Sequence, residues 1–414
     1  MKKWPVLAAA VLLFLLSGCQ KQVEPAPVSI VTATDLHFAG RDTHDYTGTF
    51  RLGSESNGSG KQMRYLDDIL DGFLWQMQTQ KPDYVLLTGD LTYIGAKASH
   101  LALAKKLSQL TQAGIQVLVV PGNQDIRNGS CTFPNGEPEE APSVTPEEFR
   151  QIYADCGYTG GISYDKNSLS YVFDTGKGTW IFMLDTNFRY GANLGKLSED
   201  TVAWLRAQLK RCKRAGAYPL LAGHHNLLEH NEMFHFGYVL DNSGDVQSLL
   251  TQSGGSLYLS GHLHPQHIAQ ENGITDIAGG SFAVYPHRYG ILTVNGAQWT
   301  YDSQTTAVAE YAAQAGIRDE NLLQYEDFGF QFFYDRAYEQ AKEILSACTE
   351  DEDLLHRLCD LSARANVYYF GGTPSMIDRG DLELLRDTAA GTDWLSYLET
   401  IFACSEDSLS CGST

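Results

Sequence analysis

Residues 84–90 read YVLLTGD, and residues 115–123 read IQVLVVPGN. Each is a short apolar run that ends at a glycine and then a polar side chain, which is typical of a buried strand leading into a loop. Residues 97–113, which lie between the two runs, are predicted to form a helix. Strands that alternate with helices build βαβ units, so this stretch predicts an α/β fold.

The same alternation continues on both sides of this stretch. Strands are predicted over 28–34, 169–173, 180–184, 218–222 and 256–259, short strands within 266–301, and helices over 63–80, 146–153 and 198–214, the last with Ser198 as its N-cap. Residues 38–60 are predicted to form a long loop, because they are rich in Gly, Ser, Thr and Asn. Residues 126–166 are rich in Pro, Glu and Gly and are interpreted as an insertion.

The pattern changes after residue 303. Five helices are predicted there without intervening strands, over 307–315, 334–347, 351–365, 382–390 and 394–404. We therefore divide the chain into an α/β domain over 28–302 and an α-helical C-terminal domain over 303–414.

The N-terminus has the features of an export signal in the expected order. Lys2 and Lys3 precede an apolar stretch over 5–16, which ends in the tetrapeptide LSGC at residues 16–19. This tetrapeptide resembles the bacterial lipobox, which implies cleavage before Cys19 and lipidation of that cysteine. Residues 1–18 are then a lipoprotein signal peptide, residues 19–27 are a tether, and the protein is extracytoplasmic and lipid-anchored to the bacterial cell membrane. The alternative is an ordinary secretory signal with a chance cysteine.

The composition limits the possible partners. The 414 residues carry a formal net charge of -20, and such a surface repels polyphosphate backbones, which argues against a nucleic-acid polymer as partner. A small anionic substrate would need local positive charge, which bound metal ions could supply.

The cysteines allow two interpretations. Seven of the eight remain if Cys19 is lipidated, and neighbours in the sequence suggest the pairs Cys131–Cys156, Cys348–Cys359 and Cys404–Cys411, with Cys212 unpaired. Reduced and buried thiols are the alternative.

Five polar residues each follow the end of a predicted strand: Asp35, Asp90, Asn123, His224 and His262. Active sites of open α/β sheets form beyond the carboxyl ends of the strands, so these side chains are expected to converge. Carboxylates, an amide oxygen and imidazoles form a mixed oxygen and nitrogen set, which suits two divalent ions such as Mn, Fe or Zn. A carboxylate shared by two such ions is typical of sites for in-line displacement at phosphorus.

The motifs around these residues resemble those of the calcineurin-like metallophosphoesterase family. They occur in the family's order as Asp35-Leu-His37, Gly89-Asp90, Gly122-Asn123-Gln-Asp125, Leu221-Ala-Gly-His224 and Gly261-His262-Leu-His264. The resemblance covers residues 28–302. It implies a four-layer α/β/β/α sandwich as the fold. It also implies hydrolysis of phosphate esters through attack of a metal-bound hydroxide. The segment from Gly89 to Ile126 is most similar to bacterial class III cyclic nucleotide phosphodiesterases, some of which are lipoproteins with an added helical C-terminal domain.

The resemblance implies specific metal ligands. Asp35, His37 and His264 would hold the first metal, Asn123, His224 and His262 the second, and Asp90 would bridge the two. His225 competes with His224 for one position; the His-x-Pro form of the family favours His224, and His225 would then contact substrate or face solvent. The run Gly89-Asp90-Leu-Thr-Tyr93 resembles the pattern of purple acid phosphatases, in which the tyrosine binds iron. Those enzymes lack the histidine of Asp-x-His, which is present here as His37, so a packed or substrate-facing Tyr93 ring is expected instead.

Gln124, Asp125 and His225 are the candidate catalytic residues. Gln124 stands where the family commonly has a histidine thought to assist the leaving group, and glutamine cannot deliver a proton at pH 7. The resemblance implies a dinuclear-metal phosphodiesterase, with cyclic nucleotides among the candidate substrates. A broad phosphomonoesterase is one alternative. Because of Gln124, a low-activity, metal-containing lipoprotein that binds phosphorylated ligands is another. The oligomeric state is left open, and the helical domain is expected to bind a partner, to mediate dimerisation or to cap the site.

Overall fold

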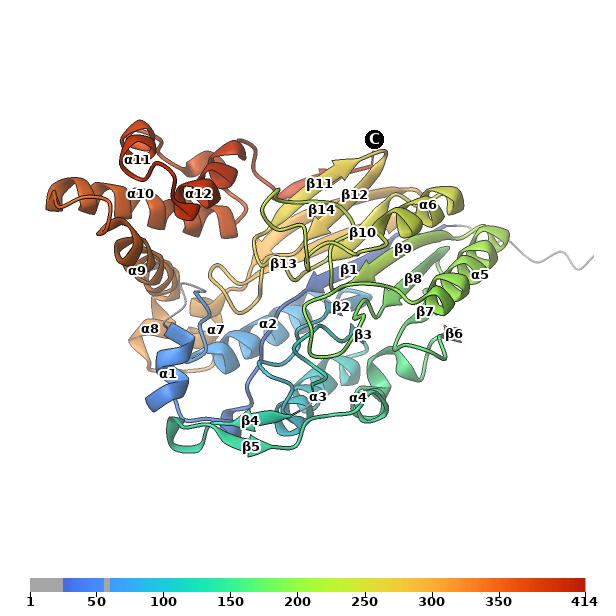
Figure 1. Cartoon of the computed structure of the whole chain (residues 1–414). Coiled ribbons are helices and arrows are strands. Elements are labelled where there is room, and N and C mark those ends of the chain that lie inside the picture. The colour runs from blue at the N-terminus through green and yellow to red at the C-terminus, as the bar shows by residue number, and fades with distance from the viewer. Residues whose placement is uncertain (1–24, 56–59, 128, 414) are drawn as a thin grey trace, which may run out of the picture.

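The computed structural model describes residues 25–55, 60–127 and 129–413. Two sheets lie face to face, and helices cover their outer faces (Figure 1). The predicted α/β/β/α sandwich with a helical C-terminal region is thus confirmed. The predicted signal peptide, the lipidated Cys19 and most of the tether lie outside the described residues.

The first sheet has six strands. Their spatial order is β15 (Ser410–Gly412), β14 (Gln298–Thr305), β13 (Arg288–Asn295), β1 (Val28–Ala33), β2 (Tyr84–Thr88) and β3 (Gln116–Val120). The strands β1, β2 and β3 run parallel, so their carboxyl ends meet at one edge. The helices α2 (Leu66–Gln80) and α3 (Lys97–Gln112) pack on the outer side of this sheet (Figure 1).

The second sheet has seven strands. Their spatial order is β11 (His267–Glu271), β12 (Ile274–Ala278), β10 (Leu257–Ser260), β9 (Tyr218–Gly223), β8 (Thr179–Leu184), β7 (Tyr171–Asp174) and β6 (Ser163–Tyr164). The strands β8, β9 and β10 are parallel to one another. The helices α5 (Glu199–Ala215) and α6 (Ser243–Ser253) cover its outer face (Figure 1).

The alternation of side chains along β8 explains the layering. Ile181 and Met183 belong to the apolar core that both sheets share, whereas Phe182 and Leu184 belong to the core beneath α5 and α6. A strand with apolar residues on both faces must be covered on both sides, and burying each such side chain contributes roughly 1.5–3 kcal/mol. Ser198 caps α5 as predicted, because its side chain accepts a hydrogen bond from the Thr201 N–H at 3.1 Å.

The remaining helices and strands lie in the insertion, in the loops and after the sandwich. They are α1 (Gly48–Glu55), the hairpin of β4 (Ser130–Thr132) and β5 (Glu139–Ala141), α4 (Pro146–Ile152), α7 (Val308–Gln314), α8 (Glu320–Leu323), α9 (Tyr325–Leu345), α10 (Glu352–Phe370), α11 (Leu382–Thr388) and α12 (Asp393–Ala403). The last four helices build a separate apolar core that includes Leu358, Leu385 and Leu398.

Several sequence predictions need correction. The predicted loop over 38–60 contains α1, α6 was not predicted, and α9 begins at Tyr325 rather than at residue 334. The chain also returns to the first sheet after the helical region, since β15 pairs with β14.

The suggested disulfides are absent from the described part of the chain, where all seven cysteines are free thiols. Cys156, Cys212 and Cys359 are buried, as the alternative interpretation expected. No helix within the described ranges is both long and apolar enough to cross a membrane.

Candidate metal centre

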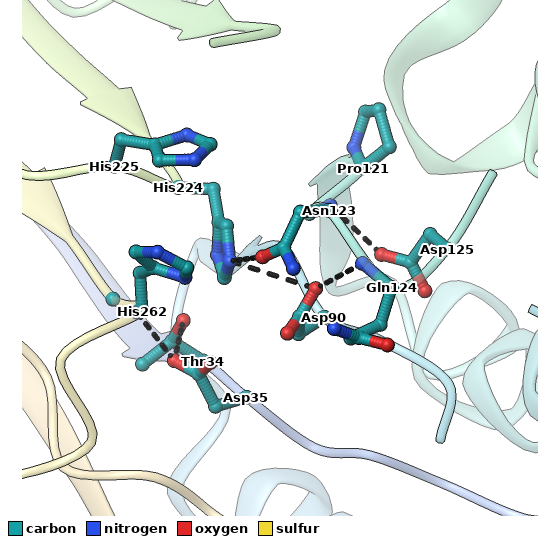
Figure 2. Close-up of polar contacts among 12 residues, drawn as sticks. Thr34, Asp35, Asp90, Pro121, Asn123, Gln124, Asp125, His224, His225 and His262 are labelled. Carbon is teal, nitrogen blue, oxygen red and sulfur yellow. Dashed lines mark hydrogen bonds and ion pairs between the residues drawn. The ribbon is translucent and has the colours of Figure 1, made fainter. Parts of the chain in front are cut away.

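The candidate ligands meet where the carboxyl ends of the parallel strands from both sheets come together. Asp35 and His37 follow β1, Asp90 follows β2, and Asn123 follows β3; His224 follows β9, and His262 and His264 follow β10. Figure 2 shows Asp35, Asp90, Asn123, His224 and His262 pointing into one space. The predicted convergence of these five side chains is therefore confirmed.

One group consists of Asp35, His37 and His264, whose ligand atoms all lie within 4.8 Å of one another. The Nε2 atoms of His37 and His264 are 3.2 Å apart. Asp35 Oδ1 is 3.4 Å from His264 Nε2 and 3.8 Å from His37 Nε2. Two imidazole nitrogens and a carboxylate oxygen thus face one small volume.

A second group consists of Asp90, His224 and His262, again with ligand atoms within 4.8 Å. His224 Nε2 lies 3.5 Å from Asp90 Oδ1 and 3.0 Å from Asn123 Oδ1. The other carboxylate oxygen of Asp90, Oδ2, lies 3.9 Å from His37 Nε2 in the first group. Asp90 therefore stands between the two groups, where a bridging ligand would be needed.

In two ligand histidines, a backbone carbonyl oxygen holds one ring nitrogen. Thr88 O holds His224 Nδ1 at 2.9 Å, and Gly237 O holds His262 Nε2 at 3.0 Å, so the opposite ring nitrogens remain available for a metal. If Nδ1 of His224 donates to Thr88, its Nε2 and Asn123 Oδ1 are two acceptors in contact, and only a cation or a proton can join them.

Asp35 carries a second indication. Its Oδ2 accepts hydrogen bonds from Thr34 Oγ1 at 2.8 Å and from the His262 N–H at 2.9 Å (Figure 2). Its Oδ1 is buried and has no hydrogen-bond partner in the described part of the chain. A buried carboxylate oxygen without a donor is costly unless a metal occupies that side. The residues present thus fit a pair of divalent ions.

The electrostatics of the two carboxylates also favour cations. Burial raises the pKa of Asp90 to about 7, and the nearby Asp35 and Asp125 carboxylates act in the same direction, against His224. Burial would raise the pKa of Asp35 as well, but the contact of His264 Nε2 at 3.4 Å and the charges of His224, His264 and His37 lower it. Burial and the charge of His224 lower the pKa of His262 to about 3, so that ring stays neutral, as a ligand must.

The backbone at the ligands adopts a rare conformation. Five ligand residues have a positive φ: 52° at Asp35, 43° at His37, 46° at Asp90, 67° at His262 and 79° at His264. Such angles cost roughly 1–3 kcal/mol each for residues other than glycine and persist where the surrounding structure enforces them. Their concentration at one edge marks this edge as a functional site.

His224 and His225 point in different directions. Figure 2 shows the His224 ring reaching toward Asp90 and Asn123, while the His225 ring turns away from them. His225 is fully buried, with Nδ1 2.8 Å from Thr186 Oγ1, and a Cβ at Gly195 would press against its ring. The solvent-facing interpretation of His225 is therefore wrong, and this geometry gives it a structural contact with Thr186.

Asp125, a candidate catalytic residue, lies behind the centre. Its Oδ2 accepts hydrogen bonds from the Leu91 N–H at 3.0 Å and the Gly122 N–H at 2.8 Å. Its Oδ1 accepts from the Thr92 N–H at 2.8 Å and from Thr92 Oγ1 at 3.0 Å. The carboxylate thus ties the loop that carries Asp90 to the loop that precedes Asn123, so Asp125 is a positioning residue.

Gln124 lies next to Asp90 and is half-buried. Its backbone N–H donates to Asp90 Oδ1 at 2.8 Å (Figure 2). Its side-chain oxygen accepts a hydrogen bond from Arg127 Nη1 at 2.6 Å. Arg127 was not singled out in the sequence, because it lies in the insertion and follows no motif. A permanent cation thus stands next to the Gln124 side chain.

Tyr93 belongs to an aromatic cluster. Its ring centroid lies 5.8 Å from that of Phe50 and 6.3 Å from that of Phe133. The packed-ring interpretation matches these contacts.

Two family models match parts of the chain, and several solved structures are similar to it. The model of the calcineurin-like phosphoesterases matches residues 28–266, and the model of the C-terminal domain of cyclic nucleotide phosphodiesterase matches residues 307–403. A dimetal phosphatase from Danio rerio is similar at 15% identity, over 68% of this chain and 96% of that one, with a TM-score of 0.48. The anchor protein of the inner membrane complex of Plasmodium is similar at 12% identity, over 68% of this chain and 85% of that one, with a TM-score of 0.40. No curated protein matches the chain.

Proposed function

Because the chain belongs to the calcineurin-like phosphoesterase family and is a metal-dependent phosphoester hydrolase, we propose that it cleaves small phosphodiesters with two divalent ions. The position of Asp90 carries this proposal, since its two oxygens face His224 at 3.5 Å and His37 at 3.9 Å. When bound, two such ions supply Lewis acidity and a nucleophile at neutral pH.

The chain's own residues orient and shield the reacting groups. Asp90 faces both ligand groups, and Asn123 presents its side-chain oxygen to His224 at 3.0 Å. The Asn123 amide is itself held, because its Nδ2 donates to Asn193 Oδ1 at 2.9 Å. Loops from both sheets thus fix the ligand atoms before a substrate arrives, which lowers the ordering cost of the reaction.

The preference for a diester, including a cyclic nucleotide, is supported by the match of residues 307–403 to the C-terminal domain of cyclic nucleotide phosphodiesterase. A panel of bis-p-nitrophenyl phosphate, p-nitrophenyl phosphate and cyclic nucleotides, assayed on protein loaded with Mn, Fe or Zn, tests it. The proposal predicts the highest kcat/KM for a diester. A preference for the monoester would replace it with a phosphomonoesterase.

Gln124 supports a second candidate, a protein that binds phosphorylated ligands with little turnover. Its amide contacts Arg127 at 2.6 Å, and neither side chain can deliver a proton at pH 7. Hydrolysis of an alkyl phosphodiester, whose leaving group needs a proton, by wild type and by Gln124→His separates the two candidates. Robust turnover by wild type removes the binder, whereas turnover that appears only in the variant establishes it.

We also propose that the protein is exported and lipid-anchored through Cys19, on the basis of the LSGC tetrapeptide at residues 16–19. Membrane fractionation of wild type and of Cys19→Ala tests this. Release of the variant from the membrane fraction is expected, and equal retention of both would contradict a lipid anchor at this cysteine.

A further inference from the structure

Lys61 lies next to the centre and has no part in the contacts described so far. Its backbone forms an antiparallel bridge with Val284. The following residue, Gln62, donates its N–H to Ala283 O at 2.8 Å. The segment that begins at Lys61 is therefore fastened to the turn that contains residues 281–284.

This turn is itself fastened to two ligand residues. The Ala283 N–H donates to Asp35 O at 3.2 Å, and the Ser281 N–H donates to His264 O at 2.7 Å. Ser281 Oγ also donates to Asp35 O at 3.0 Å. Lys61 is thus held beside the first ligand group by backbone bonds on both sides of a single turn.

The ammonium group of Lys61 interacts electrostatically with the centre. Burial lowers the pKa of Lys61, whereas the charges of Asp90 and Asp35 raise it. Burial also lowers the pKa of His37 and of His264, and the charge of Lys61 acts in the same direction on both. The side chain is partly buried, yet within the described ranges its ammonium forms no hydrogen bond or ion pair. Lysines that lose water without gaining a partner are rare, because the desolvated charge is costly.

Metal ions would leave this charge without a counterpart in the protein. Asp35 and Asp90 would then be bound to the ions, so their charges would no longer balance the ammonium. A phosphate ester brings negatively charged oxygens into this space. Lysine presents a compact charge with three donors, which suits a phosphate oxygen.

Resting on the proposed function, we propose that Lys61 binds a non-bridging phosphate oxygen of the substrate and that the helical C-terminal domain holds it in position. The C-terminal domain then has a defined task in the site. It also places a substrate-binding cation on the side of the centre formed by Asp35 and His264.

Both segments that the Lys61–Val284 bridge joins contact the helical domain. Gly60 has a φ of +65°, and a Cβ there would lie 2.5 Å from the Phe333 ring of α9. Val284 shares one apolar cluster with Phe333 and Ala337 of α9 and with Ala363 and Val367 of α10. The helices α9 and α10 therefore cover the residues on either side of the bridge, and Gly60 is required where the chain passes the Phe333 ring.

The binding of inorganic phosphate to the metal-loaded full chain, measured by calorimetry together with metal content, tests the role of Lys61. Lys61→Met is expected to weaken phosphate binding about tenfold or more and to leave the metal content unchanged, since a hydrogen bond to a charged group is lost. Lys61→Arg should recover part of the affinity. Lys105→Ala, on the exposed face of α3, is the matched control and should bind phosphate as wild type does.

Two failures can be distinguished. Wild-type phosphate affinity in Lys61→Met with full metal content would overturn the role of Lys61 and leave the proposed function intact. Wild-type protein that takes up no metal would overturn both proposals.

The positioning role of the helical domain has its own test. Gly60→Ala should weaken phosphate binding as Lys61→Met does, because the added methyl meets Phe333 and displaces the neighbouring lysine. Gly273→Ala is the matched control, since Gly273 has a φ of +76° but no atom within 4 Å of the point where a Cβ would lie. Phe333→Leu, a milder change in the same contact, should give an intermediate loss. Wild-type phosphate affinity in both Gly60→Ala and Phe333→Leu would overturn this role.

Discussion

Replacing Asp125 with asparagine tests how the metal loops are held. In wild type, each carboxylate oxygen accepts two hydrogen bonds, from Leu91 and Gly122 at Oδ2 and from the Thr92 N–H and hydroxyl at Oδ1. Asparagine has one oxygen and one NH₂ group, so one pair of donors must lose its acceptor. The less costly orientation turns the NH₂ group toward Thr92, because the Thr92 hydroxyl can then accept a hydrogen bond from the NH₂ group instead of donating one.

The magnitude follows from this orientation. One buried N–H, that of Thr92, is left without a partner, which costs about 1–3 kcal/mol. The bonds at the other oxygen also lose their charge assistance, so the expected total is about 2–4 kcal/mol. Asp125→Ala should cost more, since three backbone N–H groups then lack an acceptor.

Urea unfolding of the metal-free protein measures this loss, and a metal titration measures its effect on the centre. We expect weaker metal binding as well, because Asp90 and Asn123 lie on the loops that Asp125 joins. Asp155→Asn, at an exposed position, is the control and should change neither quantity. Unchanged stability and metal affinity in Asp125→Asn, combined with lost turnover, would refute the positioning role and return Asp125 to the reaction itself.

Three further predictions concern side chains around the centre and the domain contact. Gln124→His should raise turnover of alkyl phosphate esters by up to about 10²-fold and that of p-nitrophenyl esters much less, because only the former need a proton on the leaving group; equal gains would contradict this. Arg127→Ala should lower kcat/KM by about tenfold while the metal content stays constant, since it removes the cation at Gln124, and an unchanged kcat/KM would exclude a role for that charge. His287 Nδ1 donates to Phe282 O at 2.8 Å, so the Nε2 of the neutral ring accepts from Tyr325 Oη at 2.6 Å, and burial lowers the pKa of His287 from 6.5 to about 4. The unfolded chain therefore binds the extra proton first, so stability should fall as the pH drops from about 6.5 to about 4, by about 3 kcal/mol in total; denaturation curves of wild type and His287→Gln should converge in this window, and parallel curves would contradict the assignment.

The sequence predicted the strands of the sandwich well because their apolar runs end sharply. The β2 strand occupies residues 84–88, as predicted, and the next residues are glycine and Asp90. The family was predicted from motifs at such strand ends and is confirmed by the match over residues 28–266. Ligand positions follow from strand ends, because parallel strands bring their carboxyl ends together.

Other features have no local signal in the sequence. The β15 strand has only three residues and exists because β14 offers it a partner. The α6 helix begins with Ser243 and Gly244, which are poor helix formers, and its apolar face has few residues, chiefly Val246, Leu249 and Leu250. Both elements are fixed by tertiary contacts rather than by a periodic pattern.

The roles of the polar residues also required the structure. The motif that contains Asp125 predicts where this residue lies but not which hydrogen bonds it makes. Those hydrogen bonds show that its carboxylate supports two loops. Lys61 and Arg127 lie in irregular segments, so only the fold brings their charges to the centre. Sequence spacing identifies ligands that follow strands, whereas residues that reach the site from distant loops depend on how those loops pack.

The central claim is that Asp90 joins two metal positions. Metal analysis of the purified full chain, reconstituted with Mn or Fe and compared with Asp90→Ala, tests it most directly. We predict two ions per wild-type chain and a clear loss of metal in the variant. One ion or none in wild type, or an unchanged content in Asp90→Ala, would contradict the claim.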